Sequence, residues 1–69
     1  MTYLEILYNI VSDGNKPIWE RKDAVSKIGQ MNLDNDVIKA LSDVAKNTAF
    51  PLQIRSMASS SLFKHTLKN

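Results

Sequence analysis

Apolar residues recur every three or four positions along four stretches of this chain, which is the spacing of amphipathic helices. The stretches run from about 2 to 12, 17 to 30, 36 to 47 and 51 to 68. No segment alternates apolar and polar residues at a period of two, so strands are not expected and the chain is predicted to be all-α. The positions predicted to face inward are Leu4, Leu7, Ile10 and Val11, then Ile18, Arg21, Ala24, Val25 and Ile28, then Val37, Ile38, Ala40, Leu41, Val44 and Ala45, and finally Leu52, Ile54, Ala58, Leu62 and Phe63.

Local signals mark the ends of these stretches. Thr2 followed by Glu5 predicts a capping box at the first helix, and Pro17 and Pro51 suit first helical turns because they lack an N–H. Gly14 is predicted to end the first helix in a left-handed conformation. Since the connecting segments are short, neighbouring helices are expected to be antiparallel.

The pattern repeats after 34 residues, where Pro17-Ile18-Trp19-Glu20-Arg21 returns as Pro51-Leu52-Gln53-Ile54-Arg55. The apolar positions before the two prolines match at the same offset. A fixed period of about 20 to 50 residues is the signature of a repeat architecture. We therefore expect a single domain over residues 1–69, with a first repeat at about 2–30 and a second at about 36–68.

The second helix of each copy resembles the B helix of HEAT-like helical repeats, in which an arginine is followed by alanine, leucine and glycine at fixed spacing. The segment from Arg21 to Gly29 follows that pattern, and the segment from Arg55 to Phe63 follows it except at the closing glycine. The resemblance implies two stacked HEAT-like hairpins, a short α-solenoid, in which Asp43 is a candidate to receive an arginine. Structural rather than ligand-binding roles are expected for Arg21, Ala24, Ile28, Arg55, Ala58 and Leu62.

Composition argues against an enzyme. The chain has no cysteine, its one histidine is His65, and its seven acidic residues are scattered, so no metal site or cofactor is expected. Ser61 lies four residues before His65, so the two side chains could touch on one helical face. No acid follows Asp43, however, and no glycine-rich elbow surrounds the serine, so Ser61 is not expected to act as a nucleophile. No apolar run could span a membrane and no signal peptide is recognisable, so a cytoplasmic protein is expected.

Charge is distributed unevenly along the chain. Residues 1–43 hold seven acids and five bases, which gives −2, whereas residues 44–69 hold four bases and no acid, which gives +4. A basic block of this kind is typical of proteins that meet nucleic acid or an acidic protein surface. The four bases are Lys46, Arg55, Lys64 and Lys68.

These observations favour a non-catalytic protein-binding module, acting as a small adaptor or as an inhibitor or regulator that occupies a partner's surface. Trp19 is either an interface anchor or a cover over one end of the core, the cover being favoured; Tyr3 and Tyr8 are expected to cap the core. The alternatives are weak nucleic-acid binding through the basic C-terminal half, and a self-assembling structural module such as a homodimer. The expected partner-binding surface is the face of the two B helices, with Trp19, Lys22, Ser26, Ser60, Lys64 and Lys68.

Overall fold

The computed structural model describes the backbone of residues 1–68 and the side chains of residues 1–65. Its four helices are α1 (Tyr3–Ser12), α2 (Ile18–Gln30), α3 (Asn35–Lys46) and α4 (Leu52–Lys68). The described residues contain no strand. The predicted all-α fold is therefore confirmed, and every predicted helix end lies within one residue of the observed one.

Side chains next to the helices satisfy the free amides at two of the helix starts. At α1 the capping box forms as predicted: the Thr2 N–H donates to Glu5 Oε1 over 2.9 Å, and the Glu5 N–H donates to Thr2 Oγ1 over 3.1 Å. The hydrogen bond from the Thr2 N–H, with a smaller contribution from the Thr2 side chain, lowers the pKa of Glu5 because it favours the carboxylate. At α3 the Oδ1 of Asp34 accepts the Val37 N–H over 3.0 Å.

The turn within each hairpin is closed in the same way. Asp13 follows α1 with φ −81° and ψ 102°, and Asn47 follows α3 with φ −79° and ψ 104°. The Oδ1 of each accepts a backbone N–H two residues on, from Asn15 over 2.9 Å and from Ala49 over 3.0 Å. The prediction of a left-handed Gly14 is wrong, since no glycine has a positive φ. The side chain of Asp13 turns the chain instead.

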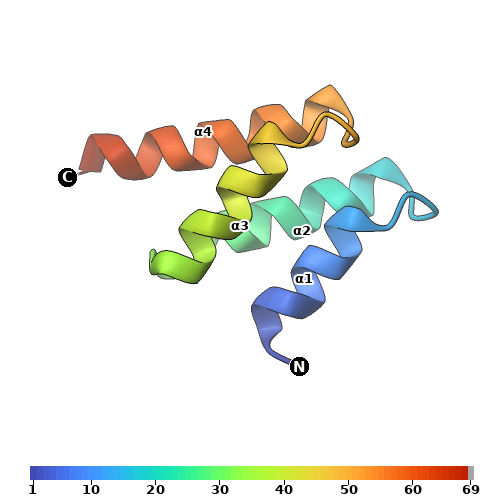
Figure 1. The fold of residues 1–69 in the computed structure, drawn as a ribbon, viewed down its shortest axis with the longest axis horizontal. Helices are drawn as coiled ribbons and strands as arrows, with labels where there is room; N and C mark the ends of the chain where they lie inside the picture. The colour runs from blue at the N-terminus through green and yellow to red at the C-terminus, as the bar shows by residue number, and fades with distance from the viewer. Residues whose placement is uncertain (69) are drawn as a thin grey trace.

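The helices form two hairpins that pack through their second members. α1 packs on α2 and α3 packs on α4, while α2 lies against both α4 and α3. Figure 1 shows α2 and α4 running side by side in the same direction, with α1 and α3 crossing them in the opposite direction. α1 and α3 make little contact with each other. The hairpins are therefore joined mainly along α2 and α4.

The core lies where α2 meets the other three helices. Phe50 joins it from the turn before α4 with only 8% of its surface exposed, although no helical pattern had marked this residue. The buried apolar side chains are Leu7, Val11, Ala24, Val25, Ile28, Val37, Leu41, Val44, Phe50, Ile54 and Ala58.

Four residues predicted to face inward are instead exposed. Ile18 and Ile38 have 40% and 38% of their surface exposed, and Leu52 and Phe63 have 67% and 63%. Leu52 and Phe63 lie on a flank of α4 that no other described element covers. Helical spacing places a residue on a side of its helix, but only the neighbouring helices decide whether that side is buried.

Candidate functional site

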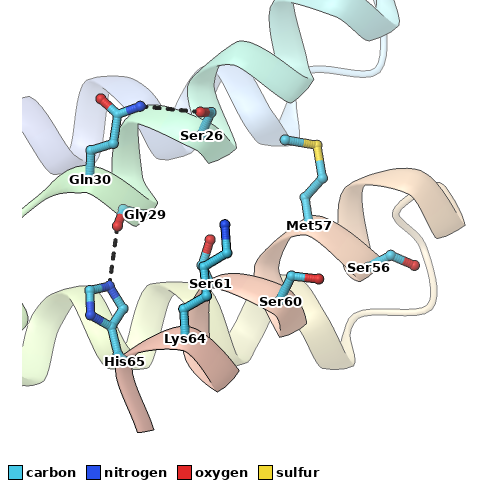
Figure 2. Close-up of a pocket in the computed structure, with 9 residues that line it drawn as sticks. All are labelled: Ser26, Gly29, Gln30, Ser56, Met57, Ser60, Ser61, Lys64 and His65. Atoms are coloured by element: carbon cyan, nitrogen blue, oxygen red, sulfur yellow. Dashed lines mark hydrogen bonds between the residues drawn. The ribbon is translucent and has the colours of Figure 1, made fainter. Parts of the chain in front are cut away.

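A groove of about 560 Å³ runs between α2 and α4 on the side away from α1 and α3. Ser26 and Gln30 line it from α2, and Ser60 and Lys64 line it from the corresponding turns of α4. Figure 2 shows these side chains on the two facing helices. The complete lining consists of Ser26, Gly29, Gln30, Ser56, Met57, Ser60, Ser61, Lys64 and His65.

Close contact of the two helices forms the floor of the groove. A Cβ placed on Gly29 would come 2.5 Å from the Oγ and 3.2 Å from the Cβ of Ser61, so any larger residue would require the serine hydroxyl to turn away and the helices to move slightly apart. The Nε2 of His65 lies 3.2 Å from the carbonyl oxygen of Gly29, a hydrogen bond visible in Figure 2. The Nε2 of Gln30 donates to the Oγ of Ser26 over 3.4 Å. The groove is thus built from small hydroxyl side chains above a tight helix crossing.

The groove carries positive charge and no lining carboxylate. Lys64 is its cation, and Lys22 lies one helical turn before Ser26 on the same side of α2. Two acids of α2 are held by lysines elsewhere on the surface: Asp23 by Lys27 over 2.9 Å, and Glu20 by Lys16 over 3.8 Å. The hydrogen bond with Asp23 raises the pKa of Lys27.

The predicted partner-binding residues are only partly brought together. Ser26, Ser60 and Lys64 line the groove, while Lys22 and Trp19 lie beyond it towards the start of α2. Trp19 has 66% of its surface exposed, so the favoured prediction that it covers the core is wrong. Lys68 ends α4, and its side chain lies outside the described residues.

The two arginines bond to backbone carbonyls within their own hairpins. The Nε of Arg21 donates to Val11 O over 2.9 Å, and the Nε of Arg55 donates to Phe50 O over 3.0 Å. The guanidinium of Arg21 also lies over the Phe50 ring, 5.9 Å from its centre, and is buried. The prediction that Asp43 receives an arginine is wrong, because Asp43 binds a tyrosine instead. The other residues with predicted structural roles, Ala24, Ile28, Ala58 and Leu62, are buried or half-buried.

A second groove, of about 710 Å³, separates α1 from α3. Leu4 and Tyr8 line one wall, and Ala40 and Asp43 line the other. The Tyr8 hydroxyl donates to Asp43 Oδ2 across it, and this bond raises the pKa of Tyr8 by favouring the neutral phenol. Sequence reasoning did not find this link because both residues lie outside the apolar stripes. The ring of Tyr3, by contrast, is exposed.

Ser61 and His65, which stand four residues apart on α4, do not form a hydrogen-bonded pair in the described part of the chain. His65 directs Nε2 to the Gly29 carbonyl instead. Residues 1–65 contain no group of three or more histidine, aspartate or glutamate side chains placed to hold a metal ion. None of the four helices, as far as they are described, is long and apolar enough to cross a bilayer.

Comparisons of the chain with protein-family models, with curated proteins and with solved structures find no match. The two grooves and the exposed helix faces are the features of the described chain that bear on its function.

Proposed function

We propose that this chain is a non-catalytic protein-binding module that acts by occupying the surface of a partner, as a small adaptor or as an inhibitor. The groove between α2 and α4 is the surface that carries the proposal. Its lining combines four serine hydroxyls with the Gln30 amide and the Lys64 ammonium, and contains no carboxylate. Hydroxyl and amide groups can pair with a peptide backbone, and the uncompensated cation selects an acidic segment.

Trp19 extends this surface beyond the groove. Tryptophan is strongly enriched among the residues that contribute most to binding energy at protein interfaces. Trp19, Lys22 and Ser26 follow one another at three- and four-residue spacing, so they share one side of α2. A partner seated on Ser26 and Lys64 would therefore reach the indole by following α2 towards its start.

A protein partner fits this face better than nucleic acid does. Single-strand binding surfaces alternate aromatic side chains with cations, whereas no aromatic ring other than the His65 imidazole lines the groove. Lys22 and Lys64 supply only two described cations on this face, which would meet few phosphates and give weak, salt-sensitive binding. We propose that the chain acts in the cytoplasm.

The test is capture of a defined protein by a tagged chain, compared across three variants. Trp19→Ala and Lys64→Glu should both lose the captured protein, while Lys39→Glu, on the opposite groove, should retain it. Circular dichroism must show unchanged helix content in all three, since all three side chains are exposed. Capture that survives both Trp19→Ala and Lys64→Glu would contradict the proposal. A mobility shift of duplex DNA that Lys64→Glu abolishes would favour the nucleic-acid alternative.

A further inference from the structure

One flank of α4 carries an exposed apolar row, which we call the α4 flank and define as Leu52, Ser59 and Phe63. These residues stand seven and four positions apart, a spacing that aligns them along one side of a helix. Leu52 and Phe63 have 67% and 63% of their surface exposed, and Ser59 is exposed too. The α4 flank faces away from α2, so it is separate from the groove.

The molecule contains a partly covered counterpart of this row. Ile18, Val25 and Gly29 stand 34 residues before the three members of the α4 flank. Val25 is fully buried and Gly29 lies against Ser61 of α4, while Ile18 at the start of α2 keeps 40% of its surface exposed. The α4 flank is therefore the equivalent of a helix-packing surface, left open. A helix lying along α4, as α4 lies along α2, would cover it.

The covering helix cannot come from a second copy stacked head to tail. In such a stack, α2 of the second copy would pack on the α4 flank of the first copy. It would sit there as α4 sits on α2 within one molecule. Its Glu20 would then occupy the place of Ile54, which has 0% of its surface exposed, and burying a carboxylate there is strongly unfavourable. Phe63, at the place of Gly29, would also prevent the close approach that Gly29 permits.

Charge selects the chemistry of the partner. Residues 44–69 contain no acid, and Arg55 lies between Leu52 and Ser59 along α4. Its Nε is held by Phe50 O, and no carboxylate pairs with it among the described side chains. Two copies meeting flank to flank would bring two such basic halves together. An acidic partner would instead be complementary.

We infer that the α4 flank is a docking surface for an acidic amphipathic helix of a partner protein. The apolar stripe of that helix packs on Leu52 and Phe63, and its carboxylates lie within reach of Arg55. Phe63 is the anchor, since phenylalanine buries a large apolar area at such contacts. This surface goes beyond the proposed function, because it does not use the groove between α2 and α4.

Two synthetic helical peptides test the inference by nuclear magnetic resonance titration of the isotope-labelled chain. They share one leucine stripe, which is flanked by glutamates in the first peptide and by lysines in the second. We expect the glutamate peptide to shift the amide signals of residues 52–63 and to bind at least about tenfold more tightly than the lysine peptide. Leu52→Ser combined with Phe63→Ser should weaken its binding at least about tenfold.

Tyr3→Ser is the matched control, because Tyr3 is an aromatic residue with 56% of its surface exposed and lies on α1, outside both the α4 flank and the groove between α2 and α4. It should leave the affinity for the glutamate peptide unchanged. Equal binding of the two peptides, or no binding at about millimolar concentration, would overturn the inference. So would signal changes centred on Ser26 and Lys64, or a doubled mass of the free chain that the Leu52/Phe63 double variant reduces to 7.8 kDa.

Discussion

Gly29 of α2 lies against Ser61 of α4 so closely that a Cβ on Gly29 would come 2.5 Å from the serine Oγ and 3.2 Å from its Cβ. The glycine therefore favours the close approach of two helices and does not serve an unusual backbone conformation, since no glycine has a positive φ. This contact joins the two hairpins and forms the floor of the groove between α2 and α4.

Replacing Gly29 by leucine should destabilise the chain, although leucine is the better helix former. The larger side chain has to push α4 away, and overpacking of this kind costs about 1–3 kcal/mol. Urea unfolding measures the change in the free energy of unfolding. Phe63→Leu, 34 residues further on, is the control, because its exposed site should tolerate the change within about 0.5 kcal/mol. A more stable Gly29→Leu variant would contradict the close contact.

Arg21 should be the more important of the two arginines for stability. Arg21→Met keeps most of the buried aliphatic stem but removes the hydrogen bond to Val11 O and the stacking on Phe50. We expect a loss of about 1.5–3 kcal/mol, the range for a hydrogen bond that involves a charged group. Arg55→Met should lose less, because Arg55 is only half-buried. Chemical denaturation measures the free energy of unfolding of both variants. Equal losses in the two would show that burial of the Arg21 guanidinium does not add to stability.

The bond between Tyr8 and Asp43 should make stability depend on pH in the alkaline range. The raised pKa of Tyr8 means that the bond stabilises the fold fully below the ordinary tyrosine value of 10.0 and is lost as pH rises through the higher folded value. At neutral pH Tyr8→Phe should lose about 0.5–1 kcal/mol. The difference between this variant and the unaltered chain should then shrink as the phenol ionises.

Asp43→Asn provides the spectroscopic check on the same bond. Removing the carboxylate charge should lower the pKa of Tyr8, and the ultraviolet absorbance of phenolate follows that ionisation directly. A phenolate titration that is the same with aspartate and with asparagine at position 43 would mean that the bond does not form in solution.

The capping box at α1 should weaken in acid. Because the pKa of Glu5 is lowered in the folded chain, its carboxylate stabilises the fold at pH values above the ordinary pKa of 4.5. This stabilisation is lost as the pH falls through the lower pKa of the folded chain. Thr2→Ala removes the Oγ1 that accepts the Glu5 N–H but keeps the backbone N–H of residue 2, so the pKa of Glu5 should rise only in part and the first turn of α1 should fray. Amide hydrogen exchange at Glu5 and Ile6, whose N–H groups donate to Thr2, measures the fraying, with the amides of α3 as the internal reference.

Sequence patterns predicted the helices well because their causes are local. The capping box of Thr2 and Glu5 depends on residues three positions apart, and helical spacing depends only on neighbours along the chain. The 34-residue period also predicted which positions correspond. For the candidate site, the sequence placed Ser26, Ser60 and Lys64 on one face, and the groove contains all three.

Contacts between distant segments could not be predicted in the same way. Phe50 is buried under Arg21, although it precedes its helix and belongs to no apolar stripe. Trp19 is exposed, although it was expected to cover one end of the core. Phe63 is also exposed, although helical spacing predicted that it faces inward. Whether a side of a helix is covered depends on where the other helices lie, and no local spacing contains that information.

The sequence by itself determined four helices, their boundaries and the correspondence between the two hairpins, since hydrogen bonds within a helix and side-chain caps act over a few residues. Tertiary structure alone decided that α2 and α4 meet at Gly29 and Ser61, that Tyr8 reaches Asp43, and that the α4 flank stays open. These outcomes depend on the shapes of surfaces that meet only after the chain has folded.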